Sequence, residues 1–327
     1  MHPFAYTAAQ TPHDVTTRGS HPPHPDILAG GTDLLQLLKE RVRTPAELID
    51  INGLDLVGIV EKDGGLRVGA LVRMSELAAD PRVTRDWPVV SKALLESASA
   101  QVRNMGTIAG NLLQRTRCPY FRDVATPCNK RDPGAGCSAL DGLNRIHAIL
   151  GTSDRCIAAH PSDLAVALVA LDARLSILGP DGEDDIAVEN LHRLPGDTPH
   201  METVLQPGDL ITAIHIPASG CARRSHYVKV RDRASFEWAL VSAAVGLELD
   251  GGTIRDARVA VGGVGTKPWR LRTVESLLIG RAPGPQVFKA AADRAADGAQ
   301  PRGDNAYKVE LLKRTVTRAL MELGGCA

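Results

Sequence analysis

The sequence predicts an α+β protein with two parts, and three features carry this prediction. Residues 26–51 read as strand, helix and strand in succession, which predicts a small βαβ unit. Two Asp-Gly-Gly triplets, Asp63–Gly65 and Asp250–Gly252, separate apolar runs as hairpin turns do. Helical periodicity dominates from residue 273 to 323. A small βαβ unit, hairpins and a C-terminal sheet with helices on it together predict the α+β class.

The βαβ unit has clear local signals. The apolar run 26–29 predicts a strand that ends at Gly30 and Gly31, and Thr32-Asp33 then opens a helix. The helix carries leucines on its apolar face and basic residues near its end, which suits the helix dipole. A second strand follows over residues 47–51.

The rest of the chain alternates between shorter elements. We expect strands over 59–72 (a hairpin), 146–150, 174–178, 225–230, 239–249 and 254–261. We expect helices over 76–79, 89–99, 162–173, 273–278, 286–296 and 307–323. A change of composition near 217–224 predicts a domain boundary.

Composition excludes several function classes. The chain has 327 residues, and its 38 lysines and arginines balance 38 acidic residues, which gives no support for nucleic-acid or acidic-membrane binding. Aromatic residues make up only 3%, so base-stacking surfaces are not expected. We find no run long enough to insert in a membrane and no signal peptide at the start. We therefore expect assembly in the cytoplasm, where thiols stay reduced.

Four of the six cysteines fall in one segment that is rich in glycine and proline. They are Cys118, Cys128, Cys137 and Cys156. Their wide spacing lacks the close pair typical of zinc sites and favours a loop around a larger object, such as a [4Fe–4S] cluster. Two disulfides or four unrelated buried thiols are the alternatives. We expect Cys221 and Cys326 to take no part.

Two glycine turns share one chemistry. The stretches AGGTD and TIAGN, at 29–33 and 107–111, place small residues where backbone N–H groups can approach phosphate oxygens. Glycine matters there because a Cβ would hold a ligand away, and because such turns often need a positive φ. An ordinary strand-to-helix turn is the alternative for either one. Together they predict a dinucleotide between them.

These motifs carry a family resemblance. AGGTDLLQLLK and RNMGTIAGNLL, with HPSDLAVALVALDA, HYVKVRDRASFEWALVSAAV and VAVGGVGTKPWRL, resemble the FAD-binding subunit of the molybdenum hydroxylases, the xanthine dehydrogenase and aldehyde oxidoreductase family. The cysteine segment resembles an insertion in a bacterial aldehyde oxidoreductase type whose flavin subunit also holds a [4Fe–4S] cluster. The resemblance covers nearly the whole chain.

The resemblance implies a domain plan. Residues 1–220 would form a two-part FAD-binding domain of the PCMH type, with a small N-terminal subdomain (1–56) and a cysteine-rich insertion (114–158). Residues 221–327 would form a C-terminal domain of an antiparallel sheet with helices.

The resemblance also implies roles for individual residues. The FAD pyrophosphate would be bound by Ile27, Leu28, Ala29, Gly30, Gly31, Thr32, Asp33 and Leu34. A second wall would be formed by Thr107, Gly110 and Asn111, although Ala109 departs from the family's usual glycine there. Asp163 would touch the ribose or adenine end of FAD, and Lys229 would lie beside the flavin ring. The four cysteines of the insertion would bind the [4Fe–4S] cluster. Taken alone, Asp163 is typical of a helix cap and Lys229 of a solvated strand residue.

The implied activity needs partner chains. A large subunit with a molybdenum cofactor would oxidise an aldehyde or N-heterocycle, and a small subunit with [2Fe–2S] clusters would pass electrons to FAD here and on to an external acceptor. The complex would be a heterotrimer or a dimer of heterotrimers, with the cysteine loop near the flavin and a subunit interface. A partner with a twin-arginine signal would carry it to the periplasm. The alternatives are a zinc-binding assembly subunit without catalysis and a stand-alone FAD oxidase.

Overall fold

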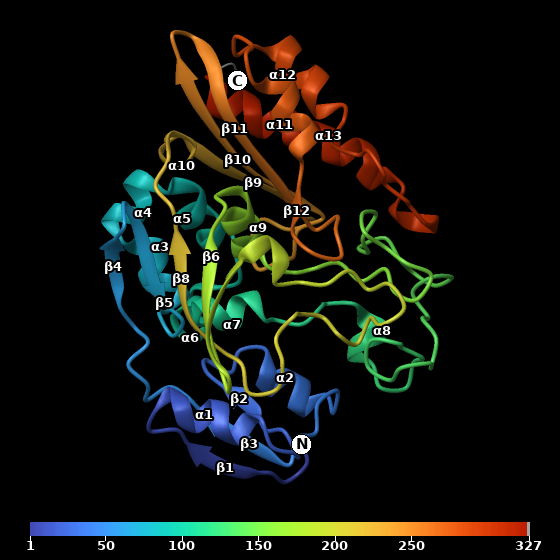
Figure 1. Ribbon diagram of the computed structural model, residues 1–327. Helices are drawn as coiled ribbons and strands as arrows, with labels where there is room; N and C mark the ends of the chain where they lie inside the picture. The colour runs from blue at the N-terminus through green and yellow to red at the C-terminus, as the bar shows by residue number, and fades with distance from the viewer. Residues whose placement is uncertain (326–327) are drawn as a thin grey trace.

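The computed structural model describes residues 1–325, so Cys326 lies outside the described residues. Its strands form three sheets, one for each of three layers along the molecule. Figure 1 shows the N-terminal unit at one end, the C-terminal domain at the other and the cysteine-rich segment at the side of the middle part. The α+β prediction is confirmed, because helices occur together with sheets that are mostly antiparallel.

The N-terminal unit is a three-stranded sheet in the order β1-β3-β2, with both pairs parallel. Its elements are β1 (Ala5–Ala8), α1 (Pro12–Gly19), β2 (Asp26–Leu28), α2 (Leu34–Lys39) and β3 (Glu47–Asp50). The predicted strand–helix–strand order around the glycine turn is confirmed. Strand β1 and helix α1 were not expected.

The middle part is built on a five-stranded antiparallel sheet in the order β4-β5-β8-β6-β7. Its strands are β4 (Ile59–Lys62), β5 (Gly65–Gly69), β6 (Arg174–Gly179), β7 (Gly182–Ala187) and β8 (Leu210–Ile216). Its helices are α3 (Met74–Ala79), α4 (Pro81–Asp86), α5 (Pro88–Leu95), α6 (Ala100–Met105), α7 (Ile108–Leu112), α8 (Pro119–Arg122) and α9 (Asp163–Ala170), with a short 3-10 turn, η1 (Val188–Asn190). Every residue of α9 is buried, so this helix forms the centre of the core.

The C-terminal domain is a four-stranded antiparallel sheet in the order β12-β11-β10-β9, with helices on one face. Its strands are β9 (Ser225–Val230), β10 (Val241–Asp250), β11 (Thr253–Gly262) and β12 (Trp269–Arg270). Its helices are α10 (Gly220–Arg223), α11 (Arg272–Leu278), α12 (Pro285–Ala292) and α13 (Tyr307–Gly324), with a 3-10 turn, η2 (Gly303–Asn305), before α13. The predicted hairpin between β10 and β11 is confirmed.

The hydrophobic core of the middle part extends to the C-terminal sheet, which has a second cluster of its own on its other side. Tyr227, Ala244 and Ala260 of the C-terminal sheet are buried in the same cluster as helices α5 and α9. This continuity fixes how the two parts meet, because burial of shared apolar surface opposes any relative movement.

One predicted element is wrong. Residues 146–150 do not form a strand, although Leu150 makes one isolated bridge to Gly265. The backbone N–H groups of Ile149 and Leu150 both donate to Val264 O, so the segment docks on a loop and does not extend a sheet. Short apolar runs cannot distinguish these two outcomes from sequence.

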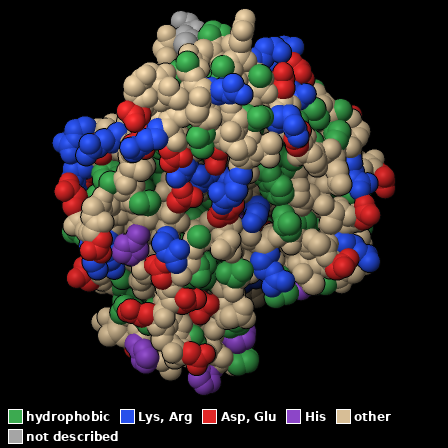
Figure 2. Space-filling model, turned by 45° about the horizontal axis from the view of Figure 1, so that its top comes forward, with side chains coloured by type: hydrophobic (Ala, Val, Ile, Leu, Met, Phe, Trp, Pro, Cys, Tyr) green, Lys and Arg blue, Asp and Glu red, His purple; other side chains and the backbone are tan. Residues whose placement is uncertain are grey.

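The surface agrees with the balanced composition. On the face shown in Figure 2, basic and acidic side chains lie interspersed. Within the described residues, no helix combines the length and the apolar character that a membrane crossing requires.

Candidate functional site

A cavity of about 970 Å³ opens between the N-terminal unit, the middle part and the C-terminal domain. Residues from both predicted glycine turns line it. Of the predicted site residues, those at its wall are Ile27, Ala29, Gly30, Gly31, Thr32, Asp33, Leu34, Thr107, Gly110, Asn111 and Asp163. Leu28 and Lys229 are not among the residues that line it. This large cavity has the size of a site for a dinucleotide or similar ligand.

The first turn, between β2 and α2, presents unpaired backbone donors. Gly31 has φ +70°, the left-handed conformation that glycine adopts without cost. A Cβ on Gly30 would lie 2.0 Å from Met105 O, so this glycine is required by close approach to the protein's own chain. Within residues 1–325, the N–H groups of Gly31, Thr32 and Asp33 have no protein acceptor. Such a turn can hold phosphate oxygens.

The second turn works differently. Four of its five backbone N–H groups are already bonded: Ile108 and Ala109 donate to carbonyls of residues 72 and 70, and Gly110 and Asn111 donate to Thr107 Oγ1 and O. The turn can therefore offer a ligand its side chains, Thr107 and Asn111, but not an amide cradle. Asn111 Oδ1 accepts a hydrogen bond from the Ser162 hydroxyl at 2.6 Å, which fixes the amide's orientation. Ala109 is only 9% exposed and its methyl belongs to the core.

Asp163 and Lys229 form a buried junction between the two large parts. The Lys229 ammonium donates to Asp163 Oδ2 at 2.8 Å and to Glu96 O at 3.0 Å, and both side chains are almost fully buried. Asp163 also accepts from the hydroxyls of Tyr227 (2.6 Å) and Ser97 (3.0 Å). The helix cap of α9 is Ser162. Lys229 is therefore not a solvated strand residue, and Asp163 is not a simple cap.

Asp33 connects the first turn to the start of the cysteine loop, which we define as residues 114–158. Its carboxylate accepts from Arg115 N at 2.8 Å and lies 2.7 and 2.8 Å from the guanidinium nitrogens of Arg117 and Arg122. These cations neutralise the carboxylate at the wall of the large cavity. Arg117 also stacks on Trp238, with 4.3 Å between guanidinium carbon and ring centroid.

The four predicted cysteines meet in one place. Cys118, Cys128, Cys137 and Cys156 line a second, small cavity together with Phe121, Ala139 and Ala158. All four are free thiols, and burial raises the pKa of Cys118 to about 12. No two of them are joined as a disulfide, so that alternative is wrong for this arrangement. Cys118, Lys130, Cys156 and Ala158 line both cavities, so the two sites are neighbours.

Sulfur spacing bears on which metal the small cavity suits. Four sulfurs around one zinc ion, at Zn–S distances of about 2.3 Å, lie about 3.8 Å apart. Within the described part of the chain, no three of the four sulfurs lie within 4.8 Å of one another. Wider spacing fits a cube with one sulfur on each of four irons.

Sequence reasoning missed three sets of polar residues around the cavities. Glu202 lies in contact with Arg115 and with Lys130, whose ammonium is 2.8 Å away; burial raises the pKa of Glu202, but the two cations outweigh burial and lower it. His160 and His192 face each other with 3.0 Å between Nε2 atoms, and burial lowers the pKa of His192 to about 4. His192 is 32 residues from His160 and 80 residues from Leu112, whose carbonyl it also contacts. Contacts over such distances leave no local signal in the sequence.

The third set is a single residue, His147, which lines the large cavity and contacts Cys118 of the small one. Its Nε2 is 3.2 Å from Cys118 Sγ, and the ring is 1% exposed. Burial, and then the positive charge of Lys308, lower the pKa of His147 to about 4.

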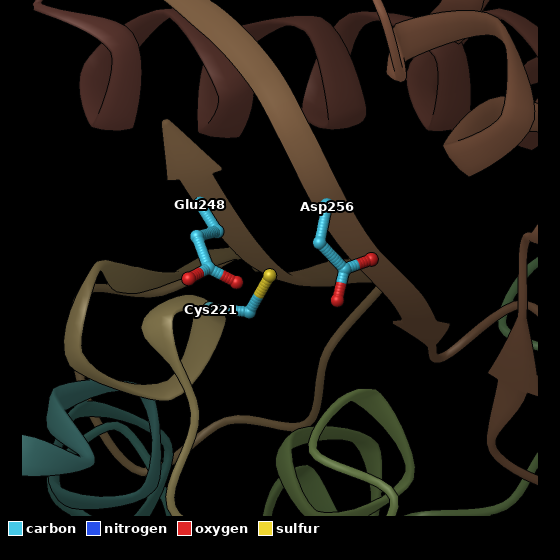
Figure 3. A group of neighbouring side chains, drawn as sticks. All are labelled: Cys221, Glu248 and Asp256. Carbon is cyan, nitrogen blue, oxygen red and sulfur yellow. The ribbon is translucent and has the colours of Figure 1, made fainter. Parts of the chain in front are cut away.

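A separate group in the C-terminal domain has metal-ligand residue types. Figure 3 shows Cys221, Glu248 and Asp256 pointing toward one another, from α10, β10 and β11. Each carboxylate is already paired with an arginine, Arg255 or Arg258. Burial raises the pKa of the Cys221 thiol to about 12, so it stays protonated. Cys221 is thus part of an internal polar contact, remote in sequence and fold from the cysteine loop.

Comparisons with known proteins agree with the two-part architecture. A family described as the FAD binding domain in molybdopterin dehydrogenase matches residues 2–219. A family described as the CO dehydrogenase flavoprotein C-terminal domain matches residues 226–323.

Individual relatives cover nearly the whole chain. The aldehyde oxidoreductase FAD-binding subunit PaoB of Escherichia coli (strain K12) is 47% identical, with 98% of each chain covered. The glyceraldehyde dehydrogenase medium chain of Sulfolobus acidocaldarius is 28% identical, over 90% of this chain and 89% of the relative. Among solved structures, quinoline 2-oxidoreductase from Pseudomonas putida 86 shares the fold, with a TM-score of 0.77, 24% identity and coverage of 99% and 98%.

Proposed function

This chain belongs to the FAD-binding subunits of the molybdenum hydroxylases, which are oxidoreductases, and we propose that it carries electrons in an aldehyde-oxidising complex through FAD and a [4Fe–4S] cluster. The observation that carries the proposal is the shared wall of the two cavities, where Cys118 and Cys156 face both. Redox centres must lie close together for electrons to pass between them. A wall shared by the large and the small cavity would keep the two bound groups close.

The residues of the large cavity suit FAD. The unpaired amides of Gly31, Thr32 and Asp33 would hold the pyrophosphate, and the side chains of Thr107 and Asn111 would form the opposite wall. Asp163 would face the ligand while Lys229 stays behind it, so the lysine would act on the flavin through the carboxylate and by its charge. We keep these roles as proposals for each residue.

The residues of the small cavity suit a [4Fe–4S] cluster. Three of its thiols are buried and Cys137 is partly buried, next to Leu37, Phe121 and Ile157, and this apolar surrounding limits the access of water to the sulfurs. When bound, FAD accepts electrons singly and releases them in pairs, and the cluster carries one electron at a time. The protein's part is to hold both groups and to exclude water.

Partners follow from the family. A large subunit with the molybdenum cofactor would hold the substrate, a small subunit with [2Fe–2S] clusters would deliver electrons, and an external acceptor would remove them. We propose an aldehyde substrate because the relative with 47% identity is a subunit of an aldehyde oxidoreductase. An exported partner would carry this chain to the periplasm, which cell fractionation of the complete complex tests.

Iron content tests the cluster. In the complex purified from iron-replete cells, the chain should hold about four irons and one FAD beyond what the partner subunits hold. Cys128→Ser should remove this iron, while the matched thiol control Cys221→Ala should keep it. Zinc in place of iron would support the assembly-subunit alternative, and flavin without iron in this chain would support the oxidase alternative. Equal iron loss in both variants would contradict the four-cysteine site.

A further inference from the structure

The segment at the start of the C-terminal helix is hydrogen-bonded to several consecutive residues of the cysteine loop. Four hydrogen bonds connect residues 304–308 to residues 144–148. They run from Asp304 N to Asn144 Oδ1 (2.9 Å), from Tyr307 Oη to Arg145 O (3.2 Å), from Lys308 Nζ to Ile146 O (2.9 Å) and from Asn305 Nδ2 to Ala148 O (3.1 Å). His147 lies within the segment 144–148. The backbone on both sides of His147 is therefore held in place by residues 304–308.

Lys308 is the most unusual member of this contact. Its side chain is fully buried, and it donates to two backbone carbonyls, Ile146 O at 2.9 Å and Gly263 O at 2.8 Å. Within residues 1–325, both acceptors of its ammonium are carbonyl oxygens and not carboxylates. Gly263 lines the large cavity, and Ile146 precedes His147. Ile146 and His147 also line the large cavity, so Lys308 fastens two segments of that wall to each other, and His147 in turn contacts Cys118 of the small cavity.

The hydrogen bonding of His147 has one satisfactory arrangement. Its Nδ1 is buried and has no partner among the described residues, so a proton there would be left without an acceptor. Its Nε2 faces Cys118 Sγ at 3.2 Å. The geometry therefore places an N–H on Nε2, where the sulfur can accept it. A metal-bound thiolate at Cys118 is an acceptor for that N–H.

We infer that His147 donates a hydrogen bond to the Cys118 thiolate and thereby raises the reduction potential of the cluster, and that Lys308 is the positioning residue that holds it there. This inference rests on the proposed [4Fe–4S] site. A donor on a ligand sulfur draws electron density away from the iron, so it stabilises the reduced state, which carries one more negative charge. Burial strengthens the effect because no water competes for the sulfur.

The test uses the complete complex and the potential of this cluster. His147→Met removes the donor and keeps an apolar side chain of similar length, while His147→Gln keeps an N–H at the place of Nε2. We expect His147→Met to disfavour reduction about tenfold, which is about 59 mV toward negative potential for one electron. His147→Gln should recover most of this shift, and Lys308→Met should cause a shift in the same direction. His21→Met, an exposed histidine in the N-terminal unit, serves as control and should leave the potential unchanged.

The possible outcomes separate the inference from the proposed function. Potentials are followed by the paramagnetic signal of the reduced cluster, with iron counted in each variant. A wild-type complex without this signal or its iron would refute the cluster itself. Full iron with an unchanged potential in His147→Met would overturn the role of His147 and leave the cluster standing. If His147→Met loses the cluster, the second measurement is made on wild-type protein with ¹⁵N-labelled histidine. A nitrogen coupling to the reduced cluster supports the hydrogen bond from His147 to the Cys118 sulfur, and its absence refutes that bond.

Discussion

Replacing Asp163 by asparagine should destabilise the protein strongly, because it leaves the Lys229 ammonium buried without a counter-charge. Asp163 accepts hydrogen bonds from Lys229, Tyr227 and Ser97, and both charged side chains are no more than 3% exposed. Breaking a buried ion pair from one side costs about 3–5 kcal/mol, since the remaining charge loses its partner and gains no water. Because the pair joins α9 to β9, the loss should loosen the contact between the two large parts.

The assay is urea unfolding of the apoprotein, with flavin content of the complex measured in parallel. Asp185→Asn is the matched control, since the Arg174–Asp185 pair is about half exposed and should contribute no more than about 1 kcal/mol. Lys229→Met should cost less than Asp163→Asn, because the carboxylate keeps its two hydroxyl donors. The double variant should cost less than the sum of the single ones, by about 0.5–3 kcal/mol.

Two results would refute this reasoning. If Asp163→Asn is no more destabilising than Asp185→Asn, the buried pair does not hold the parts together. If Asp163→Asn and Lys229→Met are additive, the two groups do not interact as the geometry requires. Flavin content adds a separate reading: a loss in Asp163→Asn that Lys229→Met does not share would indicate direct contact between Asp163 and FAD.

Further predictions concern the first turn and the buried lysine. Gly31→Ala should destabilise the apoprotein by at least about 1 kcal/mol because φ is +70°, and Gly31→Asn should cost less because asparagine tolerates this conformation; equal costs in thermal unfolding would contradict the backbone explanation. Burial lowers the pKa of Lys308 from 10.5 to about 7. Between these values the unfolded chain binds a proton that the folded chain does not, so stability from this site should rise as pH increases from about 7 to 10. The unfolding free energy of wild type relative to Lys308→Met should therefore increase between pH 7 and 9, and a constant difference would show that Lys308 does not titrate there.

Local signals in the sequence predicted the β2–α2–β3 part of the N-terminal unit and its first turn. The apolar run before Gly30 and Gly31 and the helix after them specify a strand, a turn and a helix without help from distant residues, and Gly31 has the positive φ that such a turn needs. The second turn, at 107–111, also consists of small residues, but the N–H groups of Ile108 and Ala109 donate to the carbonyls of residues 72 and 70. Sequence cannot show that difference because the acceptors lie more than 30 residues away.

The missed parts of the site depend on long-range contacts. His147 meets Cys118 across 29 residues, and Lys308 meets Ile146 across 162. A lone histidine or lysine carries no periodicity or motif that predicts such a meeting. The predicted strand at 146–150 failed for a related reason, since its polar backbone groups bond to 264 and 157 and no neighbouring strand is placed to pair with it.

The cysteine loop shows how a segment poor in large apolar residues can be ordered by its own chain. Turns rich in glycine and proline leave backbone carbonyls without helix or sheet partners, and buried carbonyls must find donors. Side chains supply them: Arg131 donates to the carbonyls of Tyr120, Phe121 and Thr126, and Asn129 Nδ2 donates to Arg155 O. A small apolar cluster that includes Phe121 closes around the thiols.

These bonds change the expected source of order in the loop. A loop of low apolar content is expected to depend for its order on metal ligation and on packing against its neighbours. The structure instead fixes one end through Asp33 and the other through residues 304–308, both from this chain. When the ligands of a metal site are already positioned, less of the metal's binding free energy is offset by the cost of ordering the loop. Contact between this loop and a partner subunit therefore remains a prediction about electron transfer, and the loop's order gives no independent reason to require it.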